Sequence, residues 1–140
     1  ELDLPIIVHD RQSKGDTLKV LKDMNVTKGV IHCFSGSAET AKILINMGFM
    51  ISFTGVITFK NAKRAIEALK VIPIERLMIE TDSPYMAPEP FRGRRNDSRY
   101  VKYVAEKMAE VKGIELEQLC EITYQNGLKF FNITKEENIQ

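Results

Sequence analysis

Tryptophan is absent from these 140 residues, and cysteine and histidine each occur only twice. Cys33 and Cys120 are too few for a disulfide framework, so we expect both thiols to stay reduced in a cytoplasmic protein. No apolar run approaches the roughly 20 residues that a membrane-spanning helix needs, which argues against a membrane protein. A strong excess of one charge is also lacking, because the formal net charge is +1. Any attraction to nucleic acid must therefore come from a local basic surface.

Segments of strand type alternate with segments of helical periodicity along the chain. The predicted strands are residues 5–9, 29–33, 49–53 and 77–80. The predicted helices are residues 15–25, 37–47, 62–71, 99–112 and 116–131. Ser37 is expected to cap the second helix, and Gly113 to end the fourth. Strands that alternate with helices predict an α/β fold with a parallel sheet and helical cover.

Both histidines and one aspartate stand where predicted strands end. His9 and His32 close two short β-branched runs, and Asp82 follows the apolar run 77–79. Catalytic groups of barrel enzymes sit at this end of the strands. A single histidine at a strand end is more often a structural residue, but His, His and Asp together are a ligand set for a divalent metal. The repetition favours a metal site.

The segment 83–98 is predicted to be a long loop rich in proline and arginine. Arg92, Arg94, Arg95 and Arg99 fall within eight residues of one another. Guanidinium groups on such a loop can bind phosphates through paired hydrogen bonds. A solvated loop with salt bridges to the helices is the alternative. The loop leaves the strand that carries Asp82, which favours a role in substrate binding.

Other chemistries have weaker support in the sequence. Cys33 follows His32 directly, but neighbouring strand residues point to opposite faces, so we interpret Cys33 as a small buried residue. The segment 35–37 lacks the five-residue Gly-x-Ser-x-Gly pattern of serine hydrolases. Walker and dinucleotide-binding glycine patterns are also missing.

Five stretches together resemble TatD-type deoxyribonucleases of the metal-dependent hydrolase superfamily. They are Pro5-Ile6-Ile7-Val8-His9-Asp10-Arg11, Ile31-His32-Cys33-Phe34-Ser35-Gly36, Ser52-Phe53-Thr54-Gly55, Glu80-Thr81-Asp82-Ser83-Pro84-Tyr85 and Arg92-Gly93-Arg94-Arg95-Asn96. Their order and approximate spacing agree with the family over nearly the whole chain. The resemblance implies a TIM (βα)8 barrel that hydrolyses phosphodiester bonds in DNA, in the 3′–5′ direction.

The resemblance also implies which part of the barrel is present. Such barrels typically have about 250 residues, so residues 1–140 match strands five to eight, the C-terminal half, with four βα units and a closing helix. The family's early His-x-His pair and its bridging Glu have no counterpart in this sequence. The expected cofactors are two divalent ions (Mg²⁺, Mn²⁺ or Zn²⁺).

By the family pattern, His9 and His32 would hold the second metal, and Asp82 would hold the first and help to activate water. Candidate phosphate contacts are Arg11, Thr58, Arg92, Arg94 and Arg95.

Three hypotheses follow. The first is that the chain is the C-terminal half of a nuclease whose substrate is DNA, single-stranded or at 3′ ends. The second is an inactive half-barrel that associates with itself, because four strands cannot close a barrel and would leave two edges and one face bare. The third is hydrolysis of a small amide or ester on the same scaffold, since the fold alone does not determine the substrate.

Overall fold

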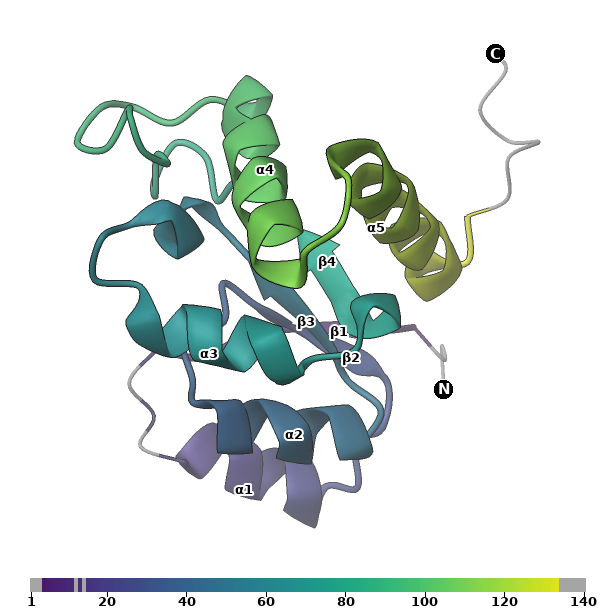
Figure 1. Cartoon of the computed structure of the whole chain (residues 1–140). Helices are drawn as coiled ribbons and strands as arrows, with labels where there is room; N and C mark the ends of the chain where they lie inside the picture. The colour runs from purple at the N-terminus through teal and green to yellow at the C-terminus, as the bar shows by residue number, and fades with distance from the viewer. Residues whose placement is uncertain (1–3, 12, 14, 134–140) are drawn as a thin grey trace.

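The computed structural model describes residues 4–11, 13 and 15–133, and their strands form one parallel sheet (Figure 1). The strands are β1 (Ile6–His9), β2 (Gly29–His32), β3 (Met50–Phe53) and β4 (Leu77–Ile79). They lie side by side in chain order, β1-β2-β3-β4. His9 pairs in register with His32, and Phe53 pairs with Ile79. The carboxyl ends of all four strands therefore meet at one edge of the sheet, as the sequence predicted.

Five helices connect and cover the strands. They are α1 (Asp16–Asp23), α2 (Ala38–Asn46), α3 (Lys63–Val71), α4 (Val101–Lys112) and α5 (Leu116–Phe131). Short 3-10 turns add η1 (Gly55–Thr58), η2 (Ile74–Arg76) and η3 (Ser98–Tyr100). The Ser37 side chain accepts a hydrogen bond from the Thr40 amide at 3.2 Å, and Gly113 ends α4 with φ 67°. Both predicted helix boundaries are confirmed. None of the helices in the described part combines the length and apolar character needed to cross a membrane.

The main hydrophobic core lies between the sheet and the helices α1 to α4. It contains the strand residues Ile31, Ile51, Phe53 and Leu77 together with helical residues such as Met108, all of them buried. The four helices follow one another along this side of the sheet in the order of the strands (Figure 1). The alternation of strand side chains thus sends one apolar set into this core.

The opposite face of the sheet has much less cover. Val30 and Met50 pack there against Phe130 of α5 in a small second cluster. Val8 packs against the main core, so its neighbour Ile7 points to this second face, and Ile7 is 63% exposed. Each of the outer strands β1 and β4 pairs with only one neighbour in the described sheet. One face and two edges of the sheet are therefore open to further contacts.

Candidate active site

His32, at the carboxyl end of β2, lies between two carboxylates that follow β4. Its Nδ1 is 2.8 Å from Glu80 Oε1, and its Nε2 is 3.6 Å from Asp82 Oδ1. The side chains of His32, Glu80 and Asp82 are 20%, 25% and 29% exposed, so the cluster is open to a ligand. A neutral imidazole that donates from Nδ1 to Glu80 keeps the Nε2 lone pair free on the side of Asp82.

Glu80 is a member of this cluster that the sequence analysis did not single out. Its Oε1 accepts a second hydrogen bond, from the Cys33 amide at 2.6 Å. The Glu80 amide in turn donates to the Phe53 carbonyl at 3.1 Å. Glu80 therefore links the ends of β2 and β3 to the segment that carries Asp82. The sequence contained a signal for it, since it is the first of two carboxylates that end the same strand.

Asp82 has a backbone conformation that is uncommon for a residue other than glycine. Its φ is 57°, and Cys33 on the neighbouring loop has φ 48°. Such left-handed residues cost about 1–3 kcal/mol and persist only where surrounding contacts hold them. Here the Asp82 carbonyl accepts from the Tyr85 amide at 2.8 Å, which closes a tight turn.

Asn96 holds this turn from across the loop, and it is a second residue whose role the sequence analysis missed. Its side chain is buried, and its Nδ2 donates to the carbonyls of Thr81 at 2.7 Å and Tyr85 at 2.6 Å. The Asn96 amide donates to the Pro84 carbonyl at 2.9 Å. Because these bonds flank Asp82 on both sides, Asn96 positions that carboxylate.

His32 and Asp82 fit part of a divalent metal site. Two donors at about 2.0–2.2 Å from one tetrahedral ion lie roughly 3.4 Å apart, close to the 3.6 Å between His32 Nε2 and Asp82 Oδ1. This distance suits two donors to one ion, whereas the family pattern assigned His32 and Asp82 to different ions. His9 is exposed on the adjacent strand, with its ring centroid 5.4 Å from that of His32. Among the described residues, no three His, Cys, Asp or Glu side chains are arranged to hold an ion. The site contains two converging donors and needs further ligands.

Cys33 differs from what the sequence predicted. It lies just beyond β2 with φ 48°, so the alternation of strand side chains does not apply to it, and it is half-buried rather than buried. Its Sγ lies 3.4 Å from Thr54 Oγ1. Burial raises the pKa of the thiol, and the nearby carboxylates of Glu80 and Asp82 raise it further. The protonated thiol is a poor nucleophile, which agrees with the choice of a metal over a cysteine mechanism.

Two of the predicted phosphate contacts have other partners. Thr58 Oγ1 donates to the Gly55 carbonyl at 2.6 Å and accepts from the Glu89 amide at 2.9 Å. The Arg92 guanidinium lies 4.2 Å from the centre of the Phe59 ring. Thr58 and Arg92 thus join η1 to the loop that follows β4. Their contact with phosphate stays a prediction.

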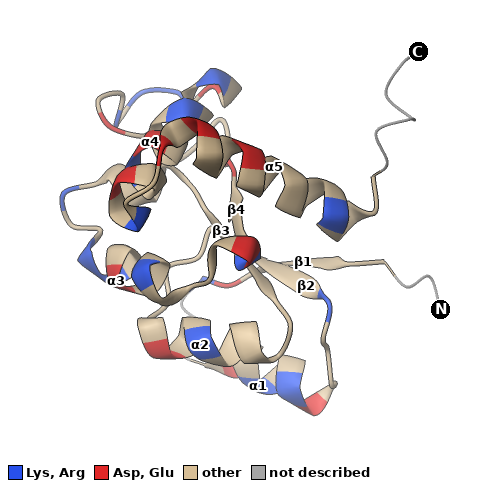
Figure 2. Ribbon diagram, turned by 45° about the vertical axis from the view of Figure 1, so that its right-hand side comes forward, with Lys and Arg blue, Asp and Glu red and all other residues tan. Residues whose placement is uncertain are grey.

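Gly55 allows this loop to approach η1 closely. A Cβ at Gly55 would collide with the Met86 carbonyl oxygen. The loop between β4 and α4 is thereby packed over η1, and it carries basic positions outward (Figure 2). Arg11, Arg94 and Arg95 are all exposed.

A cleft of about 640 Å³ lies beside the cluster, between α1 and the loop that follows β2. Its lining includes Asp10, Phe34, Ser35 and Arg64, and it does not reach His32 or Asp82. The converging histidine and carboxylates therefore lie on an open rim at the carboxyl ends of the strands. This is the end of a parallel βα sheet where barrel enzymes carry their catalytic groups.

The comparisons with known proteins identify the family. The family model described as TatD related DNase matches residues 1–132, and the chain belongs to this family. The resemblance found in the sequence is thereby confirmed.

Relatives and solved structures extend the comparison. The chain is 47% identical over 135 residues to an uncharacterized metal-dependent hydrolase, YabD, of Bacillus subtilis, covering 95% of this chain and 53% of the relative. It is 46% identical to YcfH of Escherichia coli K12, covering 95% and 51%. The crystal structure of the E. coli TatD homologue YJJV superposes with a TM-score of 0.87 at 28% identity, covering 94% and 51%. The chain spans about half the length of the curated relatives it matches.

Proposed function

We propose that the chain forms the C-terminal half of a TIM-barrel hydrolase that cleaves phosphodiester bonds in DNA with divalent metals. The observation that carries this proposal is the placement of His32 between Glu80 and Asp82 at the carboxyl ends of parallel strands. Membership of the TatD related DNase family supports the nuclease activity. The four parallel strands and the half-length match to relatives support the half-barrel.

His9, His32 and Asp82 are the residues of this chain that would hold the metals, of which a complete site would contain two (Mg²⁺, Mn²⁺ or Zn²⁺). When bound, divalent ions neutralise charge on the phosphoryl oxygens and lower the pKa of water. The other carboxylate oxygen of Asp82, Oδ2, would accept a proton from the attacking water, and Glu80 holds His32 in the orientation that keeps Nε2 free. Exposed Arg11 and the arginines of residues 92–95 bind the substrate's phosphates.

The remaining ligands come from the other half of the barrel. His32 Nε2 and Asp82 Oδ1 are two donors, whereas a tight pair of ions about 3.5–4 Å apart needs more groups around it. A bridging carboxylate and further histidines on the missing strands would complete the site.

Cys33 and Cys120 are free thiols, which supports a reducing, cytoplasmic location.

The test is cleavage of a 5′-labelled single-stranded DNA oligomer by this chain within a complete barrel, with Mn²⁺ or Mg²⁺ and with chelator. We expect a 3′–5′ ladder that requires metal. Asp82→Asn should lower the rate by about 10²-fold or more, because the amide cannot take the proton from water. Circular dichroism checks that the variant is folded. Wild-type turnover by Asp82→Asn, or cleavage of an amide or ester substrate in preference to DNA, would contradict the proposal.

We further propose that the isolated chain associates with itself. The open second face of the sheet, with Ile7 63% exposed, and the open edges of β1 and β4 favour this second function. Pairing of two copies covers both features and brings two His32–Asp82 pairs toward one rim. In that state the chain binds metal without efficient hydrolysis.

A further inference from the structure

Thr54, the residue that follows β3, has a buried hydroxyl group that contacts two different parts of the chain. Its side chain is 2% exposed. The hydroxyl oxygen accepts a hydrogen bond from the Val56 amide at 3.4 Å, which caps η1. The same oxygen lies 3.4 Å from the sulfur of Cys33, in the loop that follows β2. Thr54 therefore joins the start of η1 to the residue next to His32.

The backbone of Cys33 connects this hydroxyl group to the His32 ring. Cys33 has φ 48°, a conformation that persists only where contacts hold it. In that conformation its amide donates to Glu80 Oε1 at 2.6 Å, and His32 Nδ1 lies 2.8 Å from the same oxygen. The contact with Thr54 is one of those that hold Cys33. Loss of the Thr54 hydroxyl would therefore loosen the amide that aims Glu80 at His32.

On its other side, Thr54 is connected to the loop that joins β4 to α4. This loop packs so closely on η1 that a Cβ at Gly55 would collide with the Met86 carbonyl oxygen. It is also bonded to η1, because the Glu89 amide donates to Thr58 Oγ1 at 2.9 Å. A displacement of the loop therefore acts on η1, the turn that Thr54 caps.

The His32 ring has two alternative states, because a neutral imidazole carries its proton on Nδ1 or on Nε2. The contact with Glu80 favours a proton on Nδ1, which leaves Nε2 free. We propose that Thr54 is a positioning residue that couples the loop after β4 to the choice between these two states. Engagement of the loop by a substrate and the readiness of His32 to bind a metal are then linked, and each affects the other. This inference rests on the proposed function, in which Nε2 of His32 is a metal ligand.

The coupling is tested by the position of the proton on the His32 ring. The chain contains only two histidines, so ¹⁵N-histidine labelling gives signals from two rings, and His9→Gln assigns them. Spectra of the full chain are recorded in chelator at about pH 8.5, above the ordinary titration range of histidine. We expect the proton of wild-type His32 on Nδ1. Thr54→Val keeps the shape of the side chain, removes the hydroxyl and should change the tautomer ratio by about 2- to 30-fold in favour of Nε2–H. Thr54→Ser keeps the hydroxyl and should restore the wild-type ratio.

The loop side of the coupling is tested with Thr58→Val, which removes the hydroxyl that accepts from the Glu89 amide. This variant should shift the His32 ratio in the same direction as Thr54→Val. Combined with Thr54→Val it should add nothing further, because both changes act through the same contact.

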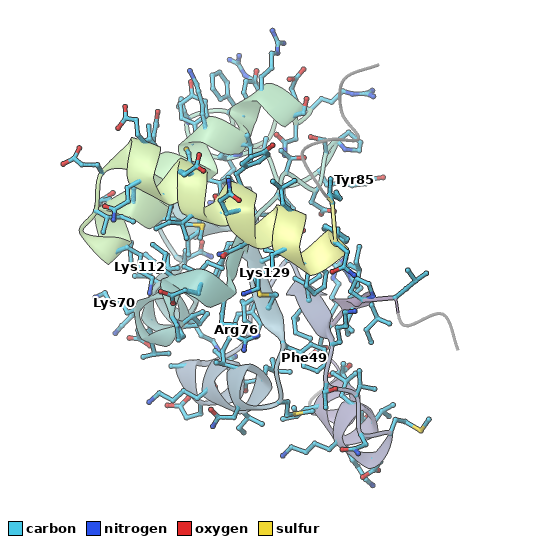
Figure 3. All side chains as sticks on the ribbon, turned by 90° about the vertical axis from the view of Figure 1, so that its right-hand side faces the viewer. Phe49, Lys70, Arg76, Tyr85, Lys112 and Lys129 are labelled. Atoms are coloured by element: carbon cyan, nitrogen blue, oxygen red, sulfur yellow. The ribbon has the colours of Figure 1, made fainter. Side chains whose placement is uncertain are left out.

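Two control variants report on a general loss of stability. Thr123→Val removes another buried hydroxyl, which donates to the Leu119 carbonyl of α5 at 2.9 Å. Lys112→Met removes the contact of Lys112 with the Lys70 carbonyl at 3.5 Å. These two lysines lie on the opposite side of the view in Figure 3 from Tyr85, which belongs to the loop after β4. Both controls should leave the His32 ratio unchanged.

Several outcomes would overturn the inference. One is a proton on Nε2 of wild-type His32, and another is an equal tautomer ratio in the wild type and Thr54→Val. Equal shifts in the two control variants and in Thr54→Val would show that the ratio follows stability alone. Additive shifts of Thr54→Val and Thr58→Val would show that the loop does not act through Thr54.

The fate of the proposed function is separable from these results, since the spectra need neither metal nor substrate. The expected shifts without metal-dependent cleavage of DNA by the complete barrel would keep the positioning role and refute the nuclease. Cleavage together with unchanged ratios would keep the nuclease and refute the positioning role.

Discussion

The imidazole of His32 has two nitrogen atoms, and the contact with Glu80 determines which of them is free. The contact of 2.8 Å between Nδ1 and Glu80 Oε1 commits Nδ1 to donation, so Nε2 remains as the donor toward a metal. A carboxylate partner also fixes the plane of the imidazole ring. Glu80 itself is held by the Cys33 amide. The orientation of the His32 nitrogen that we propose as a metal ligand therefore depends on Glu80.

We expect Glu80→Gln to weaken metal binding by about 10- to 100-fold, the usual effect of losing such an outer partner. The amide keeps the shape of the side chain but lacks the charge that favours donation from Nδ1. Isothermal titration with Mn²⁺ measures the affinity directly, without reference to activity. Glu106→Gln is the matched control, because Glu106 is exposed on α4. An affinity for Mn²⁺ equal to that of the wild type would show that Glu80 does not orient His32.

The raised pKa of Cys33 predicts slow alkylation. Burial, with help from Glu80 and Asp82, raises the pKa of this thiol above its ordinary value of 9.0. The folded protein therefore holds the proton more tightly than the unfolded chain, and this contribution to stability, present below pH 9, is lost as pH rises through the folded-state pKa. Iodoacetamide at pH 8 should modify exposed Cys120 well before Cys33, as mass spectrometry would show. Equal rates at pH 8 would contradict the shift.

Residue identities could be predicted from the sequence where a pattern repeats. His9 and His32 end β1 and β2, Asp82 follows β4, and the structure brings His32 and Asp82 to 3.6 Å. Asn96 could not be found in this way, because its role comes from carbonyls 11 and 15 positions away. The hydrogen bond between Thr58 and the Glu89 amide could not be predicted either, since Glu89 lies 31 positions further along the chain. Contacts of this kind depend on how a loop folds back, which local patterns do not encode.

At the scale of elements, the sequence predicted every strand and helix, with boundaries that differ by up to two residues. The apolar periodicity of each segment agrees with the face it buries, as for Ala41 and Leu44 of α2. The three 3-10 turns η1, η2 and η3 were not predicted. Each has only three or four residues, too few for a period to be recognised. Short turns are set by their caps and by the loops that pack on them.

Asn126 ties helix α5 to η2 and the start of β4 by hydrogen bonds. Asn126 Nδ2 donates to the carbonyls of Ile74 at 2.9 Å and Leu77 at 2.8 Å, at the start of β4. We expect Asn126→Ala to lower the free energy of unfolding by about 1–3 kcal/mol, because two carbonyls lose their donor. Urea denaturation measures the change. Gln118→Ala, at an exposed position of the same helix, should stay within about 0.5 kcal/mol of the wild type. Equal stability of the two variants would contradict the anchoring role.

At the scale of the whole molecule, the two faces of the sheet differ in how far they are covered by other elements. One face is sealed by α1 to α4, whereas the other carries only the small cluster of Val30, Met50 and Phe130. Parallel sheets are normally covered on both faces. The sheet is thus covered on the helical side and open on the side where a barrel would have its interior. An open face together with two open edges favours association.

The last prediction concerns that open face. Light scattering of the chain at tens of micromolar should give twice the mass of one copy, because pairing removes Ile7 and the open strand edges from water. Ile7→Lys places a charge on the second face and should shift the chain to a monomer. Val20→Lys is the matched control, since Val20 is 58% exposed on α1, on the helical side of the sheet. A wild-type chain that is monomeric and unfolds cooperatively would refute self-association, and its open face would then be tolerated in water.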